Sequence, residues 1–345
     1  MSDDDEYYDE PPKSGLLSKL VAVSSWFVTM AMVGLGAVFL LIVETQRPGP
    51  TGPGGASPST IVIPRGVGVS AIGDHLQAEG VIRSALTFRA GALLYSRGRS
   101  LKAGEYAIPP HESMAGVIER LAAGKVVLHQ LTTPEGWTSD MVMNLVASSD
   151  VLEGDMPPAP PEGSILPETY NIERGEERAA VIKQMQTAQT ETLAELWAKR
   201  ADNLPFRTPE QAVILASVVE KETGLASERP RVAAVFVNRL RKGMRLESDP
   251  TVIYGVSKGK PLGRGLLASE LAKETPWNTY KIYGLPATPI SNPGRASLAA
   301  VLNPPNTNDL YFVADGTGGH VFAGTLADHQ KNVARWRAIE KARGT

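Results

Sequence analysis

The sequence predicts an α+β protein with a single N-terminal transmembrane helix, a small βα module and a larger α+β domain. The first observation is an uncharged run, Leu20–Val43, that is long enough to cross a bilayer. The second is a segment rich in proline and glycine directly after it. Beyond that segment, short runs of β-branched residues alternate with segments of helical apolar spacing, which is typical of a mixed fold. The predicted parts are a tail over 1–19, the transmembrane helix over 20–43, a linker over 44–59, the module over 60–130 and the larger domain over 131–345.

The composition excludes several classes of function. Of the 345 residues, 42% are hydrophobic, which suffices for a sizeable core, and the formal net charge is −2. Because the basic residues form no long cluster, nucleic-acid binding is not expected. The absence of cysteine excludes disulfides, thiolate metal sites and cysteine nucleophiles. The five histidines show no paired spacing, so we expect no metal site. We also expect no other cofactor.

Leu20–Val43 is predicted to span the membrane once. Its 24 residues exceed the apolar region of a cleaved secretory signal, and no A-x-A cleavage site follows. The alternative is a buried core helix. Lys13 and Lys19 precede the run and Arg47 follows it, so the positive-inside rule favours a cytoplasmic N-terminus by a small margin. The rest of the chain is then expected on the other side of the membrane.

The linker contains four prolines and four glycines within Arg47–Ser59. Such a segment neither buries apolar surface nor sustains a helix. It is therefore predicted to lift the outer part of the chain off the bilayer. A proline-rich recognition motif is the alternative.

The module over 60–130 contains a weak internal repeat. A strand is predicted at Ser59–Pro64, where β-branched residues dominate. Two segments then follow one order: a capping serine, an apolar pair four residues apart, a glycine and a valine. They are Ser70, Ile72, Leu76, Gly80 and Val81, and Ser113, Val117, Leu121, Gly124 and Val126. A small βα module fits this pattern.

The most informative helix lies in the larger domain and begins at a capping box, Thr208–Gln211, with proline at the first helical position. The next eight residues, Ala212–Val219, contain one polar side chain, Ser217, so the helix is predicted to be buried on all sides. Glu220 follows at its C-terminal end. Desolvation and the negative end of the helix dipole are both expected to raise the pKa of Glu220, which suits a general acid.

Other interpretations remain open for the carboxylates near this helix end. Glu220 is otherwise a structural carboxylate that pairs with Arg229 or Arg239. Glu222 is the reserve candidate, or else a solvated residue. It lies about 200° round the helix from Glu220, so the two carboxylates diverge and cannot form the pair of a retaining glycosidase. Ser248 or Asp249, with Pro250, is predicted to start a short helical turn through Tyr254, and Asp249 is interpreted first as its N-cap.

The helix carries the run ASVVEKET, and the long block ASERPRVAAVFVNRLRKGMRLESDPTVIYG follows it. Shorter blocks are Thr133–Gly136, Glu162–Tyr170, Pro276–Tyr280 and Gly284–Gly294. Together they extend from about Ile61 to Val333 and resemble the MltG (YceG-like) family of endolytic murein transglycosylases. The long central block is highly specific. Departures from the family pattern are Trp277 for tyrosine, Ala287–Thr288 for Pro-Gly and Glu168 for aspartate.

The resemblance implies a lytic transglycosylase that cleaves the β-1,4 bond between N-acetylmuramic acid and N-acetylglucosamine in nascent glycan strands. The cut would leave a 1,6-anhydro end and terminate elongation. Glu220 would be the catalytic residue, acting as acid and then as base. Tyr254, Asn278 and Tyr280 would bind the substrate through aromatic faces and amide hydrogen bonds; a surface loop without ligand is the alternative for them. The module would be LysM-like, and would either bind glycan or only position the catalytic domain.

The same resemblance implies a single-pass protein of the cell inner membrane with a periplasmic catalytic domain. Its partners would be peptidoglycan glycan strands, the inner membrane and peptidoglycan synthases. A muramidase that hydrolyses the same bond, with Asp249 assisting the water, is the nearest alternative. A wall-binding scaffold without catalysis is an alternative of a different class.

Overall fold

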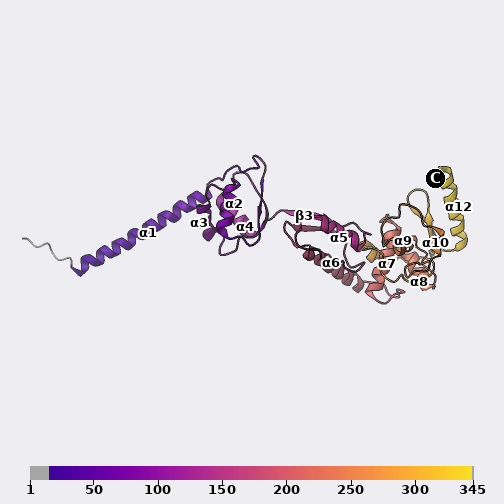
Figure 1. Ribbon diagram of the computed structural model, residues 1–345. Helices are drawn as coiled ribbons and strands as arrows, with labels where there is room; N and C mark the ends of the chain where they lie inside the picture. Colours follow the sequence, from indigo (N-terminus) through magenta and orange to yellow (C-terminus); the bar gives the residue numbers. More distant parts are fainter. Residues whose placement is uncertain (1–14, 344–345) are drawn as a thin grey trace, which may run out of the picture. The chain divides into compact units, whose positions relative to one another are not determined.

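The computed structural model describes residues 15–343 and contains both helices and short sheets (Figure 1). Most of the predicted tail over 1–19 lies outside the described residues. The chain divides into two compact units, 1–127 and 128–345, which are described separately. Each sheet in the described part consists of two antiparallel strands. The predicted mixture of helix and sheet is confirmed, whereas the LysM-like assignment of the first unit stays a prediction.

The first unit contains a two-stranded antiparallel sheet and three short helices that share one core. β1 and β2 pair antiparallel, with Ser59 opposite Ile108 and Ile63 opposite Gly104. Alternate residues of β1 are buried, because successive side chains of a strand point to opposite faces. The elements of this unit are α1 (Leu16–Gln46), β1 (Ser59–Ile63), α2 (Val69–Ala78), α3 (Ala85–Tyr95), β2 (Gly104–Ile108) and α4 (Met114–Ala123).

The predicted strand and the second half of the predicted repeat are confirmed in this unit. Ser113 is the N-cap of α4, and its hydroxyl accepts a hydrogen bond from the N–H of Gly116 at 3.2 Å. Gly124 ends α4 in the left-handed conformation that glycine adopts without steric cost. The first half was partly wrong: α2 begins at Val69, so Ser70 lies inside the helix instead of capping it.

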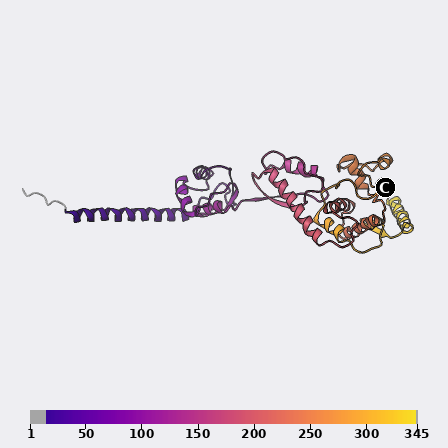
Figure 2. The ribbon, with the colours of Figure 1, turned by 90° about the horizontal axis from the view of Figure 1, so that it is seen from below.

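The predicted transmembrane segment forms α1, a long helix that leads into the first unit (Figure 2). Ser18–Gln46 is long and apolar enough to cross a membrane. Its apolar side chains are exposed until the last turn, where Thr45 is fully buried. The hydroxyl of Thr45 lies 3.0 Å from that of Tyr95 on α3. The C-terminal end of α1 is therefore part of the first unit.

The segment after α1 differs from the predicted free linker. The N–H of Gly49 donates to the carbonyl of His111 at 3.1 Å, and the N–H of His111 donates to that of Pro50 at 3.1 Å. A Cβ at Gly49 would collide with the carbonyl oxygen of Glu112. Glycine allows this close approach of two backbones. The start of the segment is therefore held by hydrogen bonds to the chain at His111.

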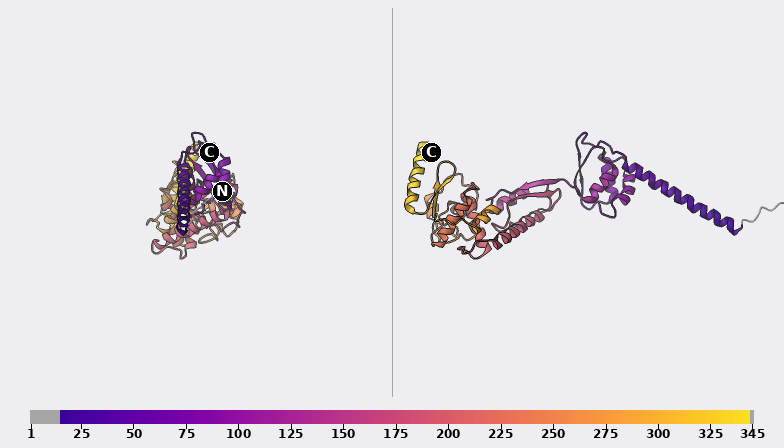
Figure 3. Two further views of the ribbon diagram at one scale, coloured as in Figure 1. Left: turned by 90° about the vertical axis from the view of Figure 1, so that its left-hand side faces the viewer. Right: turned by 180° about the vertical axis from the view of Figure 1, so that it is seen from behind.

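The second unit has a larger core around α7 and a smaller core that includes residues of a two-stranded antiparallel sheet. In this sheet, β3 and β4 pair with Leu128 opposite Glu173 and Thr132 opposite Thr169. The helix α12 ends the chain (Figure 3). The elements are β3 (Leu128–Thr132), α5 (Ser139–Ser148), β4 (Thr169–Glu173), α6 (Arg178–Ala198), α7 (Pro209–Glu222), α8 (Arg229–Arg241), α9 (Asp249–Ser257), α10 (Ala268–Ala272), α11 (Arg295–Leu302), β5 (Tyr311–Ala314), β6 (His320–Ala323) and α12 (Leu326–Arg343).

α7 lies in the larger core and packs against α8 and α11. Its residues 212–219 are buried, apart from Ile214, which is half-buried. The prediction of a helix that is buried on all sides is therefore confirmed. The capping box is confirmed as well: Thr208 accepts from the N–H of Gln211 at 3.3 Å, and the Gln211 side chain accepts from the N–H of Thr208 at 3.3 Å.

Replacing Thr208 by alanine should lower the free energy of unfolding by about 1 kcal/mol, because an orphan N–H of the first turn of α7 loses its acceptor. The matched control is Thr187→Ala on α6, an exposed threonine whose hydroxyl bonds only the carbonyl of Lys183 in its own helix. That control should be neutral or slightly stabilising. Chemical denaturation of both variants measures the difference; equal losses would contradict the role given to the capping box.

Candidate active site

The last turn of α7 brings two carboxylates, Glu220 and Glu222, to the edge of the larger core. They are two positions apart, so they leave the helix about 200° from each other. The structure gives them different partners, as the divergence predicts. The two side chains therefore lie in different environments.

Glu220 is held inside the protein by two donors. Its side chain is only 4% exposed. Oε2 accepts from the N–H of Gly294 at 2.9 Å, and Oε1 lies 3.4 Å from Nη2 of Arg229. Arg229 also contacts Glu135 at 3.3 Å. These contacts are those of the structural carboxylate that the alternative interpretation described, in which Glu220 pairs with Arg229.

Glu222, the reserve candidate, has a different set of neighbours. Oε1 accepts a short hydrogen bond from the hydroxyl of Ser248, and the residue is half-buried. Desolvation by burial raises the pKa of Glu222 to about 7, and the negative charge of Asp249 adds to the rise. The Ser248 hydrogen bond and the charges of His320 and Arg239 act in the opposite direction. A carboxyl group near this pKa is partly protonated at neutral pH, as a general acid requires.

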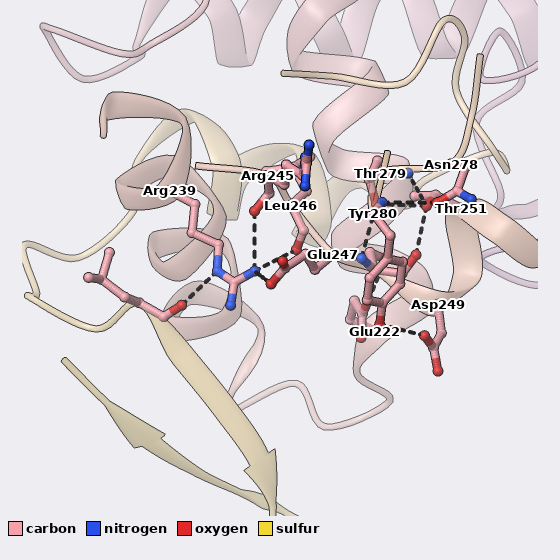
Figure 4. Close-up of polar contacts among 12 residues, drawn as sticks. Glu222, Arg239, Arg245, Leu246, Glu247, Asp249, Thr251, Asn278, Thr279 and Tyr280 are labelled. Atoms are coloured by element: carbon pink, nitrogen blue, oxygen red, sulfur yellow. Dashed lines mark hydrogen bonds and ion pairs between the residues drawn. The ribbon is translucent and has the colours of Figure 1, made fainter. Parts of the chain in front are cut away.

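The chain between α8 and α9 places Ser248 against Glu222 (Figure 4). The guanidinium of Arg239 donates to the carbonyls of Leu246 at 2.9 Å and Arg245 at 3.2 Å, and to that of Leu310 at 2.7 Å. One buried cation thus satisfies three carbonyls of two separate loops. Because a guanidinium has a rigid fork of donors, the path of this chain is closely specified.

Two buried threonines hold the other side of Ser248. Its N–H donates to Oγ1 of Thr279 at 3.0 Å. The hydroxyl of Thr251 donates to the carbonyl of Ser248 at 2.6 Å and lies 2.8 Å from the hydroxyl of Thr279 (Figure 4). The backbone of Ser248 is therefore bonded on both sides, which leaves its own hydroxyl to bond Glu222.

Asp249 and Tyr280 lie beside Glu222 in the same network (Figure 4). The prediction that Asp249 is an N-cap was wrong: Ser248 occupies the N-cap of α9, and Asp249 is the first helical residue. The carboxylate of Asp249 is exposed and accepts from the hydroxyl of Tyr280 at 2.7 Å. Burial, followed by the hydrogen bond to Asp249, raises the pKa of Tyr280, so the phenol stays a donor at neutral pH.

The other two predicted substrate-binding residues have partners within the protein. Asn278 is fully buried, and its amide donates to the carbonyls of Lys273 at 2.6 Å and Leu271 at 3.1 Å. Its Oδ1 accepts from the N–H of Tyr280 at 3.0 Å. Asn278 therefore supports the loop that carries Tyr280. The hydroxyl of Tyr254 donates to Glu162 at 3.3 Å, so Tyr254 belongs to a different contact from the Glu222 network.

Sequence reasoning missed the role of Ser248 and the pair of Glu228 and His320. Nδ1 of His320 lies 2.7 Å from Glu228, whose other oxygen accepts the backbone N–H of His320 at 2.8 Å. The charge of His320 acts on Glu222. These contacts join positions 26 and 92 residues apart. Residue spacing along the sequence could not have indicated these two contacts. The available signal was the long family-specific block, which contains Ser248.

The cavity of about 850 Å³ in the second unit is separate from these carboxylates. It lies between α6 and the first half of α7, and its lining includes Gln189, Glu162 and Thr288 but neither Glu220 nor Glu222. Within residues 15–343, no three His, Asp or Glu side chains gather in a way that could hold a metal ion. The site around Glu222 therefore offers acid–base chemistry on a partly open surface.

Comparison with known proteins places the chain in a family. An endolytic murein transglycosylase of Streptococcus pneumoniae serotype 2 (strain D39) is 28% identical over 90% of this chain, and the chain spans 64% of that relative's length. An endolytic murein transglycosylase of Bacillus subtilis (strain 168) is 29% identical over 79% of this chain and 82% of its own length. A crystal structure of a YceG-like protein from Listeria monocytogenes is 28% identical, covers 80% of this chain and 98% of its own, and superposes with a TM-score of 0.49. The YceG-like family matches residues 61–335, and the chain belongs to this family.

Proposed function

We propose that the chain is an endolytic peptidoglycan lytic transglycosylase and that Glu222 is its catalytic acid and base. The relatives that bear this name support the reaction class. The observation that carries the assignment is the position of Glu222 at the end of α7, where the Ser248 hydroxyl bonds it and Asp249 and Tyr280 lie beside it. Burial at this position raises the pKa of Glu222 to about 7. Glu220, the residue that the family resemblance implies, is the alternative proposal for the acid; its enclosed side chain and its two donors favour a structural role.

The chemistry needs only one carboxyl group of this kind. Protonated Glu222 donates its proton to the glycosidic oxygen as the bond between the two sugars breaks. The carboxylate that remains then takes the proton from the 6-hydroxyl of the muramic residue as that oxygen bonds to its own anomeric carbon. Because the nucleophile belongs to the substrate, no second carboxylate has to activate water. The group that Ser248 orients thus acts first as acid and then as base.

A muramidase is the second candidate function, and the carboxylate of Asp249 is the observation that favours it. It is an exposed carboxylate beside Glu222, and a hydrolase that inverts or retains configuration uses two carboxylates. The hydrogen bond from Tyr280 engages one oxygen of Asp249. That bond favours a role for Asp249 in tuning Glu222 over activation of water.

The location and the partners are part of the same proposal. α1 would anchor the chain once in the inner membrane, with the N-terminus in the cytoplasm and the second unit in the periplasm. Two lysines before the apolar run, Lys13 and Lys19, against Arg47 after it favour this orientation by a small margin. The first unit would be the LysM-like part. Nascent glycan strands are the proposed substrate, and peptidoglycan synthases are the proposed protein partners.

Product analysis separates the two reactions. Purified protein that digests uncrosslinked glycan strands should release fragments with 1,6-anhydro-muramic ends, because the internal hydroxyl replaces water. Mass spectrometry distinguishes these ends from reducing ends by the loss of one water. Reducing ends would identify a muramidase, and glycan binding without new ends would identify a scaffold.

Glu222→Gln should reduce anhydro-end formation by about 10²–10⁴-fold or more, because the amide keeps the size of the side chain but has no proton to transfer. Glycan binding should persist. The matched variant is Glu220→Gln, which changes the same atoms two positions earlier on α7. It should lower stability, through the weakened contact with Arg229, more than it lowers the rate per folded molecule. A large rate loss confined to Glu220→Gln, with full folding by circular dichroism, would move the acid to Glu220.

The pH profile tests the environment of Glu222 directly. An acid must be protonated, and the protonated fraction of Glu222 falls as the pH rises through about 7, so kcat/KM should fall about tenfold per pH unit above that value. Ser248→Ala removes a hydrogen bond that lowers the pKa, so the falling limb should move to higher pH. Asp249→Asn removes a charge that raises the pKa, so the limb should move to lower pH. A limb that stays in place in both variants would exclude Glu222 as the titrating acid.

A further inference from the structure

α3 in the first unit has an exposed apolar face opposite the core. The residues that it buries are Ala85, Phe88, Gly91 and Ala92. Three leucines lie on the outer side, and 75% of Leu86, 86% of Leu93 and 44% of Leu94 is exposed. We call these three residues the α3 leucine face. At about 100° per residue they lie on the side of the helix opposite Phe88 and Ala92.

The composition of α3 is that of a helix covered on both sides. Among its 11 residues, Arg89 is the charged one, and it pairs with Asp74 of α2 at 2.6 Å. Single exposed leucines are common on protein surfaces. Three large leucines on one face of a helix that is apolar all round indicate that something apolar covers that face.

The position of α3 in the unit suggests what covers it. Gly91 faces the end of α1, where a Cβ would meet Cγ2 of Thr45 at 3.1 Å, and the hydroxyls of Thr45 and Tyr95 are 3.0 Å apart. α1 contacts α3 and α4, and Leu41, which is still within the apolar run that ends at Val43, is half-buried. α3 is therefore attached to α1 at the level where the apolar run ends.

We propose that the α3 leucine face inserts into the interfacial layer of the leaflet from which α1 emerges. This inference rests on the proposed anchoring of α1 in a membrane. An apolar helix face at this level enters the boundary between headgroups and acyl chains, which removes the leucines from water. Arg83, Arg97 and Arg99 flank the helix and are exposed, so their guanidinium groups are available to phospholipid phosphates.

The hydrogen-bonded segment after α1 supports the insertion of the α3 leucine face into the bilayer surface. The hydrogen bonds between Gly49, Pro50 and His111 tie the chain that follows α1 to the same unit. The unit is thus connected to α1 by packing as well as by the covalent chain. A free spacer would let α3 leave the bilayer surface, whereas this connection holds it there.

The test uses the full chain, which has no cysteine, so that single cysteines can be introduced for spin labels. Leu93→Cys and, separately, Leu86→Cys are labelled and reconstituted into vesicles of phosphatidylethanolamine and phosphatidylglycerol. The matched control is Gln77→Cys, an exposed position on α2 of the same unit. Power-saturation spectroscopy compares collisions with oxygen, which concentrates in lipid, and with a water-soluble nickel chelate. We expect the ratio of oxygen to nickel accessibility at both leucine positions to be several-fold higher than at Gln77.

Each other outcome overturns the inference. Equal ratios at the leucine positions and at Gln77 would show that the face is in water. Exclusion of both reagents would show that protein covers it, either a second copy or another partner. A label at Val33→Cys reports on α1 itself: a low ratio there would refute the membrane anchor, whereas a high ratio there with a low ratio at Leu93 would refute the seating of α3 alone.

Discussion

The burial of α7 on every side is the constraint on which the candidate site depends. No residue between Ala212 and Val219 carries a charge, and its one polar side chain is satisfied internally: the Ser217 hydroxyl donates to the carbonyl of Ile214 at 2.7 Å and accepts from the N–H of Ile290 at 3.0 Å. The carboxylates of α7 lie in its terminal turns: Glu210 in the first, and Glu220 and Glu222 in the last. Because α7 is packed on all sides, its last turn has a fixed position, and so does any reactive group on it.

The two carboxylates have different partners, although both lie within the same helical turn. A guanidinium and a backbone N–H bond Glu220, and such donors stabilise a carboxylate as part of the structure. Glu222 is near another carboxylate, Asp249, and receives one neutral hydrogen bond from Ser248. Proteins commonly give two acidic groups different acid–base properties by placing them in different environments. The environments of Glu220 and Glu222 differ because different faces of α7 contact different loops.

The sequence predicted the elements that local chemistry determines and missed those that depend on distant contacts. The apolar run of α7, its capping box at Thr208 and the cap of α4 at Ser113 were all predictable, because each depends on neighbours within four residues. The burial of the Glu220 side chain was predictable from the apolar run before it, whereas the surroundings of Glu222 were not. Both lie at the helix end, and burial arguments from the sequence apply to both; the partners that distinguish them, above all Ser248, come from other parts of the chain.

Arg239 holds the chain that carries the hydrogen bond to Glu222. Glu247, directly before Ser248, has a φ of 53°, a left-handed conformation that costs a residue with a Cβ roughly 1–2 kcal/mol. Arg239 offsets this cost by binding the carbonyl of Leu246 and the side chain of Glu247, at 2.9 and 3.0 Å. The strained residue turns the chain so that the Ser248 hydroxyl faces α7. The geometry around the proposed acid is therefore maintained by the fold itself, so binding of a glycan need not supply energy to assemble it.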